Sequence, residues 1–560
     1  MNSGPPFPAV ASAAHASPWR FAPAALVALP FVFPVVAGPS ANVWQLLASW
    51  VCMALLLLCA PAAVPASRVL AWLGAGAAAV AVSPGSDVAL VLGACAALAA
   101  MVLAAAVGAG IARAEPAFHR ALAAGLLAAG LVSAVLGLLQ YLGLAAWLVP
   151  LTTAPEPGQA YGNLRQRNQF ATLINMALVA ALWLHADGGR VRRRVVVGAC
   201  VVLMMAAAAS TSRTGLLQLA AIAGVAGALA WRERRKRPPA AATRLPHPLV
   251  LTGLLAVYAL ASWLLPGLVP GEVDGMLTRL REGAPVAHSR MVLWRNVLEL
   301  VAQHPWRGWG WGELSFAHYV HPYAHTRFVE ILDNAHNLPL HLAVELGLPA
   351  AVVLCAGFAC MVLSARPWRE YDARRAMAWG VMGVIVLHSL LEYPLWYGPF
   401  QLAFGLCLGL LWPGTRVLAS SGAPWWPALA ASLLLATSAW AGRDYVRVSQ
   451  LYLAREERLP ALRDDTLAKL RDTRLYASTV DFAALAMMQL TPSTAEAMYE
   501  LSGRMLHFSP EPRVIVKRIE SGLLLGHLDE AHAEMARFER AFPLEYMQWR
   551  PGREAAGGPD

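Results

Sequence analysis

A succession of long apolar runs constrains this chain more than any other feature of its sequence. A lipid bilayer admits only backbone whose polar groups are satisfied within the segment, so apolar runs near about 20 residues are expected to be helices. Composition agrees, since 58% of the 560 residues are hydrophobic and only 14% are charged. The runs cover 21–38, 43–65, 69–83, 88–111, 120–143, 169–186, 195–209, 214–231, 248–267, 337–364, 376–393, 398–413 and 425–441. The sequence therefore predicts an all-α, polytopic membrane protein with about 12 to 13 transmembrane helices. The alternative for two of the short runs is a re-entrant segment that does not cross the bilayer.

The basic residues predict the orientation of these helices, because loops on the cytoplasmic side carry an excess of Lys and Arg. With the N-terminus inside, alternate loops hold Arg68, Arg113, Arg120, Arg190, Arg192, Arg193, Arg194, Arg232, Arg234, Arg235, Lys236, Arg237, Arg366, Arg369, Arg374, Arg375 and Arg416. The loops 144–168, 210–213, 268–336 and 394–397 then face outside, and an odd number of spans puts the tail 442–560 outside as well. This placement explains much of the net charge of +10, so no nucleic-acid partner is expected.

Cysteines and the two chain ends add little chemistry. All seven cysteines lie in apolar segments without the spacing of a zinc site, and the polar parts have none to pair as disulfides. The small residues of AVASAA precede the first apolar run, which favours an uncleaved first span over a cleaved signal peptide. The tail reads as amphipathic helices, and GHLDEAHAEMARFERAFP resembles half of a tetratricopeptide-like hairpin.

Four polar elements on the expected external side are candidates for chemistry. They are YGNLRQRNQFATL with Asn163, Arg165 and Gln169; STSRTG with Arg213; HSRMVLWRNV with His288 and Arg290; and DNAHNLPLH with Asn334, His336 and Asn337. Each also has a plain interpretation as an interfacial cap, a snorkelling anchor or a helix on the membrane surface. Arginines and histidines are costly in lipid, so several of them at one boundary favour a functional interpretation.

Arginine and histidine together suit transfer from an activated lipid-linked donor. A pyrophosphate leaving group needs fixed positive charge, and Arg offers a planar, always protonated fork to phosphate oxygens. An acceptor hydroxyl needs a base near neutral pH, and a histidine with a reference pKa of about 6.5 can take that proton. The alternatives at this stage are a metal site at His318, His321 and His325, against which Pro322 argues, and two i,i+4 pairs that tether helices. These pairs are His341 with Glu345 and His388 with Glu392.

The ordered set GNLRQRNQFATL, SRTG, HSRMVLW, HPWRGWGWGE, NAHNLPLHLAVELGLP and EYPLWYGPFQLAFG resembles bacterial protein O-oligosaccharyltransferases of the pilin-glycosylation (PglL) type. These enzymes form part of the O-antigen ligase and polymerase superfamily. The resemblance implies His336 as the essential histidine and Arg213 and Arg290 as pyrophosphate-binding residues. Arg165, Asn163, Gln169, Asn334, Asn337, His288 and Glu392 are expected to bind substrate. One departure is Arg167, where the family commonly has proline.

The resemblance also implies an activity and a location. We expect transfer of a preassembled glycan from undecaprenyl pyrophosphate to Ser or Thr hydroxyls of periplasmic proteins such as pilin, with inversion and without metal or cofactor. The alternatives are an O-antigen ligase that acts on lipid A-core and, from another class, a transporter or lipid-glycan flippase. The expected location is the cell inner membrane, with the active site and C-terminus periplasmic. The expected parts are N-terminal transmembrane helices over 1–143, an O-antigen ligase-like catalytic membrane domain over 144–441 and a helical periplasmic domain over 442–560.

Overall fold

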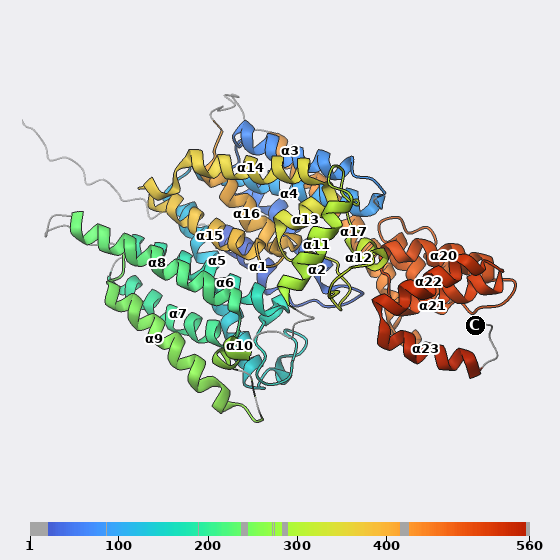
Figure 1. The fold of residues 1–560 in the computed structure, drawn as a ribbon. Helices are drawn as coiled ribbons and strands as arrows, with labels where there is room; N and C mark the ends of the chain where they lie inside the picture. The colour runs from blue at the N-terminus through green and yellow to red at the C-terminus, as the bar shows by residue number, and fades with distance from the viewer. Residues whose placement is uncertain are drawn as a thin grey trace, which may run out of the picture.

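The computed structural model describes residues 21–85, 87–188, 190–236, 245–271, 273, 275–282, 289–414 and 425–555. Over these residues the chain is built of α-helices and short 3-10 turns, with a single isolated bridge between Pro65 and Pro413 and no strand. The predicted all-α class is therefore confirmed (Figure 1).

The helices fall into three groups along the chain. The bundle consists of α1 (Ala22–Val32), α2 (Ala41–Cys59), α3 (Ser67–Ala81), α4 (Val88–Ile111), α5 (Pro116–Tyr141), α6 (Arg167–Asp187), α7 (Arg190–Ala209), α8 (Arg213–Lys236), α9 (Pro248–Leu264), α13 (Leu338–Leu346), α14 (Leu348–Ala365), α15 (Ala373–Ser389), α16 (Gly398–Leu411) and α17 (Trp426–Ser449). The segment between α9 and α13 holds α10 (Met276–Glu282), α11 (Arg290–Gln303) and α12 (Leu314–Val320). The tail holds α18 (Thr466–Lys469), α19 (Ala477–Met487), α20 (Ala495–Phe508), α21 (Pro512–Leu524), α22 (Leu528–Ala541) and α23 (Pro543–Ala555).

Each of the thirteen predicted runs contains a helix, but not all of these helices can cross a bilayer alone. Over the described residues, seven helices are long and apolar enough to span: Asn42–Cys59, Val88–Ile111, Pro116–Tyr141, Arg167–Asp187, Arg213–Arg235, Pro248–Leu268 and Leu348–Arg369. Apolar helices such as Ala22–Val32 and Gly398–Leu411 are shorter than the roughly 20 residues that a straight span needs. The chain is thus a multi-pass membrane protein, and a total of 12 to 13 crossings stays a prediction.

The predicted single span over 337–364 was wrong, because the structure divides it into α13 and α14 at Gly347. Gly347 has φ +84°, a conformation that residues with a side chain rarely adopt. A Cβ there would also lie 2.4 Å from the carbonyl oxygen of Trp306. The short helix α13 therefore ends where the chain before α12 crosses it.

Close helix packing holds the centre of the bundle together. Helices α4 and α16 approach so closely that a Cβ on Gly409 would lie 1.9 Å from the carbonyl oxygen of Ala105. A Cβ on Gly108 would lie 2.2 Å from the carbonyl oxygen of Leu406. In lipid the hydrophobic effect does not drive helices together, so van der Waals packing must hold them. Small residues allow this packing because the helix backbones can approach closely.

The basic loops that the charge rule placed on one side do meet in space. The Arg120 Nε lies 3.0 Å from Asp187 Oδ2, and Arg192 Nη1 lies 3.7 Å from the same oxygen. The Arg375 guanidinium donates to the carbonyl oxygen of Leu411 at 2.9 Å. These contacts join loops at one end of the bundle, whereas the compartment that this end faces stays a prediction.

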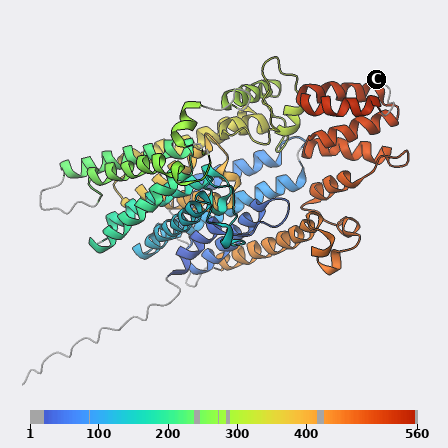
Figure 2. The same ribbon diagram turned by 90° about the horizontal axis from the view of Figure 1, so that it is seen from below.

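The tail packs against the segment around α12. In this segment Tyr319 donates a 2.6 Å hydrogen bond to Glu534 of α22, and Glu313 lies 2.7 Å from His507 Nδ1 of α20. The His507 ring also stacks on Phe316 at 3.8 Å between centroids. Figure 2 shows the red tail helices beside this yellow-green segment at one end of the molecule. The predicted helical character of the tail is confirmed, and the stretch GHLDEAHAEMARFERAFP contains α22.

Candidate functional site

His336 lies in a tight polar turn just before α13. Its φ of +50° is uncommon for a residue with a side chain, and such conformations gather at functional sites because the surroundings must hold them. Asn334 Oδ1 accepts the backbone N–H of His336 at 2.9 Å. Asn337 caps α13 through the Leu340 N–H, and its Nδ2 donates to the carbonyl oxygen of Leu390 at 2.9 Å. The two asparagines thus fix the backbone that aims the imidazole.

The His336 imidazole contacts a carboxylate in the loop that follows α15. Its Nδ1 lies 2.7 Å from Glu392 Oε2, and the ring meets Tyr393 edge to face at 5.0 Å between centroids. An ionised carboxylate only accepts, so the neutral imidazole carries its proton on Nδ1 and leaves Nε2 with a free lone pair. Among the residues that the structure describes, Nε2 has no hydrogen-bond partner. This is the arrangement of a general base held by a carboxylate.

Glu392 is buried, with 5% of its surface exposed, yet it stays charged. Burial raises the pKa of Glu392, but the hydrogen bond from His336 and the charges of His336 and Arg290 outweigh it and hold the pKa below its usual range. Arg290 Nη2 donates to Oε1 of the same carboxylate, and Asn168 Nδ2 donates to Oε1 at 3.2 Å. Residues far apart in the chain therefore meet at one carboxylate.

A hydrogen-bonded path continues from this carboxylate to the turn between α7 and α8. The Ser212 hydroxyl donates to Asn168 Oδ1 at 2.6 Å. The neighbouring Thr211, with φ +47°, accepts from Arg279 Nη1 at 3.1 Å and from Arg167 Nη1 at 3.4 Å. The path places the arginine-lined turn beside the His336–Glu392 pair.

Three helices begin at this place with an arginine. Arg167, Arg213 and Arg290 occupy the first positions of α6, α8 and α11. The positive end of a helix dipole repels a cation there by about 0.3–1 kcal/mol for each helix. At α11 the Glu392 carboxylate offsets this repulsion, whereas at α6 and α8 it costs stability unless an anion binds. Helix N-termini and guanidinium groups both favour phosphate oxygens.

A layer of buried polar side chains lies on the bundle side of the site. Thr172 Oγ1 of α6 lies 2.9 Å from His388 Nδ1, and Gln218 of α8 donates to Thr172 at 3.0 Å and to the carbonyl oxygen of Val384 at 2.9 Å. These bonds tie α6, α8 and α15 together beneath the turn. The prediction that His388 and Glu392 share a helix face was wrong, because α15 ends at Ser389 ahead of Pro394. The two residues still interact, since the Glu392 N–H donates to the His388 carbonyl oxygen at 2.8 Å, while the Glu392 carboxylate contacts His336.

Other predicted site residues hold the framework. Asn163 is buried and donates to the carbonyl oxygens of Val32 and Leu151 at 2.7 and 3.1 Å. Arg165 donates to the carbonyl oxygens of Pro34 and Val35, and burial lowers its pKa. The contacts with Val32, Pro34 and Val35 tie the loop before α6 to the end of α1 and the chain that follows it.

Gln169 and His288 are the two further residues that were predicted to bind substrate. The backbone N–H of Gln169 is capped by Gln166 Oε1 at 2.7 Å, while its side chain is buried next to Tyr397. His288 lies outside the described residues. The structure therefore brings His336 and Arg290 onto the Glu392 carboxylate, with Asn334 and Asn337 fixing the His336 backbone. Arg213 contacts the carbonyl oxygen of Arg279, and Asn163, Arg165 and Gln169 support the framework.

The histidine-rich stretch around α12 is structural. His318 Nδ1 lies 2.7 Å from the Tyr323 hydroxyl and Nε2 lies 3.0 Å from the carbonyl oxygen of Phe328, and burial lowers the pKa of His318 to about 3. Across the described residues, no group of three His, Cys, Asp or Glu side chains gathers that would hold a metal ion. The predicted pair of His341 and Glu345 is confirmed at 3.2 Å on α13.

Sequence reasoning missed the contributions of Asn168, Ser212 and Arg279. Asn168 and Ser212 look like ordinary helix-start residues, and only the long-range contacts reveal the path they form. Arg279 carried one usable signal, because an arginine in the loop 268–336 is an exception to the charge rule that places basic residues inside.

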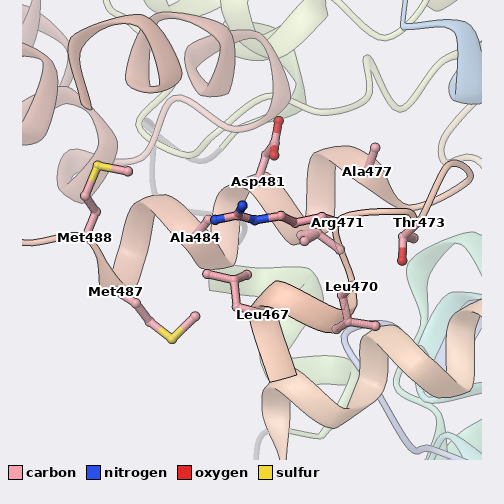
Figure 3. A pocket seen from close by; sticks show the side chains of 10 residues that line it. Leu467, Leu470, Arg471, Thr473, Ala477, Asp481, Ala484, Met487 and Met488 are labelled. Atoms are coloured by element: carbon pink, nitrogen blue, oxygen red, sulfur yellow. The ribbon is translucent and has the colours of Figure 1, made fainter. Parts of the chain in front are cut away.

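A separate hollow of about 340 Å³ lies in the tail, between α18 and α19. Leu467, Leu470, Arg471, Asp481, Met487 and Met488 are among the side chains that line it (Figure 3). It shares no residue with the His336–Glu392 site.

Comparison with known families gives three matches along the chain. A model described as protein glycosylation ligase matches 160–185, one described as O-antigen ligase matches 198–355, and one described as the C-terminal part of a virulence factor membrane-bound polymerase matches 376–555. Arg167 and Asn168 fall in the first range, Arg213, Arg279, Arg290 and His336 in the second, and Glu392 in the third. The residues of the site are thus spread over all three matches.

One curated relative supports the same assignment. A general O-oligosaccharyltransferase of Acinetobacter baylyi is 26% identical over 302 residues, which are 51% of this chain and 49% of that protein. The matched region thus spans about half the length of that relative. No solved structure matches the chain. The matches confirm the resemblance to protein O-oligosaccharyltransferases of the O-antigen ligase superfamily.

Proposed function

We propose that this chain, which resembles the protein O-oligosaccharyltransferases, is a glycosyltransferase that moves a preassembled glycan from undecaprenyl pyrophosphate to Ser or Thr hydroxyls of periplasmic proteins such as pilin. In this proposal it is a multi-pass protein of the inner membrane, with its site and tail in the periplasm. The reaction inverts the anomeric carbon and uses no metal.

The His336–Glu392 pair is the single observation that carries the proposal. With Nδ1 donating to Glu392 at 2.7 Å, Nε2 is the atom that takes the proton from the acceptor hydroxyl. The imidazolium that forms is stabilised by the carboxylate, which the lowered pKa of Glu392 keeps ionised. The hydroxyl oxygen then attacks the anomeric carbon from the side opposite the pyrophosphate.

The arginines around the turn at Thr211 supply the second requirement, which is charge for the leaving group. As the glycosidic C–O bond breaks, negative charge grows on the pyrophosphate, and preorganised donors stabilise it without reorganisation. The resemblance assigns this role to Arg213 and Arg290. Loss of one such contact typically raises the barrier by about 3 kcal/mol.

The protein-directed activity is favoured by the match to a protein glycosylation ligase over 160–185 and by the general O-oligosaccharyltransferase relative. A second candidate, ligation to lipid A-core, is favoured by the match to O-antigen ligase over 198–355. The two differ only in the acceptor, because both need the same donor chemistry.

An acceptor swap tests the proposal. Purified full-length protein in nanodiscs receives undecaprenyl-pyrophosphate-linked glycan with either a Ser/Thr-containing periplasmic protein or lipid A-core. We expect glycosylated protein, detected by intact mass; product on lipid A-core alone would favour the second candidate. Absence of both products from folded protein would contradict a transferase and favour the transporter alternative.

Substitution of His336, the proposed general base, tests the mechanism. His336→Ala is expected to abolish transfer and to leave membrane insertion intact, because the imidazole is partly exposed in a loop rather than in the bundle core. Normal glycosylation by this variant would overturn the role given to His336.

A further inference from the structure

Two guanidinium groups converge on the buried Thr211, and a third, exposed one bonds to the backbone beside them. Arg279 of α10 donates to its hydroxyl at 3.1 Å and to its carbonyl oxygen at 3.4 Å. Arg167 of α6 donates to the same hydroxyl at 3.4 Å. Arg213 of α8 donates to the carbonyl oxygen of Arg279. The cluster of Arg167, Arg213 and Arg279, called the arginine cluster below, thus joins three helices at one turn.

The arginine cluster has only neutral acceptors. Over the residues that the structure describes, no carboxylate forms an ion pair with any of its members. Burial lowers the pKa of Arg279 because its guanidinium loses hydration, and no described carboxylate compensates for that loss. Cations held close together and partly desolvated destabilise the fold unless an anion joins them. A phosphate-bearing ligand has the matching charge.

Arg290 stands in the opposite situation. Its guanidinium is paired with Glu392, which also holds His336 at 2.7 Å. The charge of Arg290 is therefore already offset within the protein, and its contact fixes the carboxylate that fixes the base. The two groups of arginines therefore differ in electrostatic state, although a hydrogen-bonded path through Ser212 and Asn168 links them at Glu392.

From this difference, and resting on the proposed function, we infer a division of labour among the arginines. The arginine cluster binds the diphosphate of the lipid-linked donor, with Arg279 and Arg167 as two further donor-binding residues. Arg290, to which the resemblance gives a pyrophosphate-binding role, is instead a positioning residue that acts through Glu392 on His336. The path from Thr211 through Ser212 and Asn168 to Glu392 places the two groups side by side, with bonds of 2.6 and 3.2 Å at Asn168.

The same positive charge would also suit an acidic sugar of the glycan, so the probe must separate the two sources. Undecaprenyl pyrophosphate without a glycan carries the diphosphate alone. Undecaprenol carries the same lipid chain without phosphate and reports on lipid binding.

The experiment measures equilibrium binding of these two lipids, and of the glycan-bearing lipid-linked donor, to the full-length protein in nanodiscs, without acceptor. Arg279→Ala and Arg167→Ala are each expected to weaken binding of undecaprenyl pyrophosphate about tenfold to hundredfold, because each removes charge-assisted hydrogen bonds. Binding of undecaprenol is expected to stay unchanged. Arg279→Lys, which keeps the charge but not the fork, should recover part of the loss.

Arg281 provides a matched control. It lies exposed two residues further along α10, where the helical periodicity points it to the other face. Arg281→Ala is expected to bind undecaprenyl pyrophosphate as the unaltered protein does. Arg290→Ala should keep binding within about threefold while its turnover falls about hundredfold, as a residue that acts only in the transition state would.

The outcomes separate this inference from the proposed function. Unaltered affinity in folded Arg279→Ala and Arg279→Lys, or a loss in Arg290→Ala as large as in Arg279→Ala, would overturn the division while glycosyl transfer by the unaltered protein stands. A loss confined to glycan-bearing donor would assign the cluster to an acidic sugar and would overturn the diphosphate assignment. Failure of the unaltered protein both to bind undecaprenyl pyrophosphate and to transfer glycan would overturn the proposed function and the inference together.

Discussion

Substitution of Glu392 by glutamine tests the chemistry of the site with almost no change of shape. The carboxylate accepts hydrogen bonds from His336 Nδ1 at 2.7 Å, from Asn168 Nδ2 at 3.2 Å and from Arg290. Glutamine offers one accepting oxygen and one donating NH2 group. Arg290 can only donate, so we expect the oxygen to turn to Arg290 and Asn168 and the NH2 group to turn to His336.

This turn forces a change of tautomer. The amide NH2 group donates to His336 Nδ1 only if Nδ1 is unprotonated. The imidazole proton then sits on Nε2, which no longer has a free lone pair for the hydroxyl of the acceptor protein. General base catalysis contributes about 10²–10⁴-fold, so kcat of Glu392→Gln should fall by that factor, or about 3–5 kcal/mol of barrier. The KM for the lipid donor should change little, because the arginine cluster that we propose to bind the donor is untouched.

The assay is steady-state transfer to an acceptor protein in nanodiscs, with kcat and KM measured separately. Glu345→Gln is the matched control, since it removes a buried carboxylate that lies 3.2 Å from His341 but outside the site. The control should lose thermal stability and keep its kcat. A Glu392→Gln variant with kcat within about threefold of the unaltered protein would refute the reasoning about the tautomer.

Other parts of the chain make independent predictions. Gly409→Val should cost at least about 1–3 kcal/mol because its side chain meets backbone 1.9 Å away, whereas Gly383→Ala, with nothing within 4 Å, should be neutral or stabilising by thermal unfolding in detergent. Tyr319→Phe should weaken the packing of the tail against the segment around α12 by about 1–3 kcal/mol, because the buried Glu534 carboxylate loses a hydrogen-bond donor. Limited proteolysis should then cut the tail faster, and an unchanged rate would contradict the prediction. Burial lowers the pKa of His318 to about 3, so the unfolded chain binds a proton on this residue at higher pH than the folded chain does, and stability is lost as pH falls from about 6.5 towards 3. Hydrogen exchange around α12, corrected for intrinsic rates, should therefore accelerate over that pH range, and protection that does not depend on pH would contradict the prediction.

The helical character of the chain and much of its site were readable from the sequence. Apolar runs in lipid have few alternatives to helix, so every predicted run contains one. Arg213, Arg290 and His336 stood out because polar residues at a membrane boundary are costly and therefore conspicuous. Local patterns of this kind are carried by neighbouring residues, so a linear string is enough to show them.

The partners of these residues were decided only by the tertiary structure. A count of apolar residues did not reveal that the chain crossing at Trp306 ends α13 at Gly347, nor that α15 stops before Glu392. Glu392 meets His336 across 56 positions, and Arg279 reaches Thr211 across 68. Such contacts depend on how helices pack and where loops return, which is set by the sum of many distant side chains rather than by any local pattern.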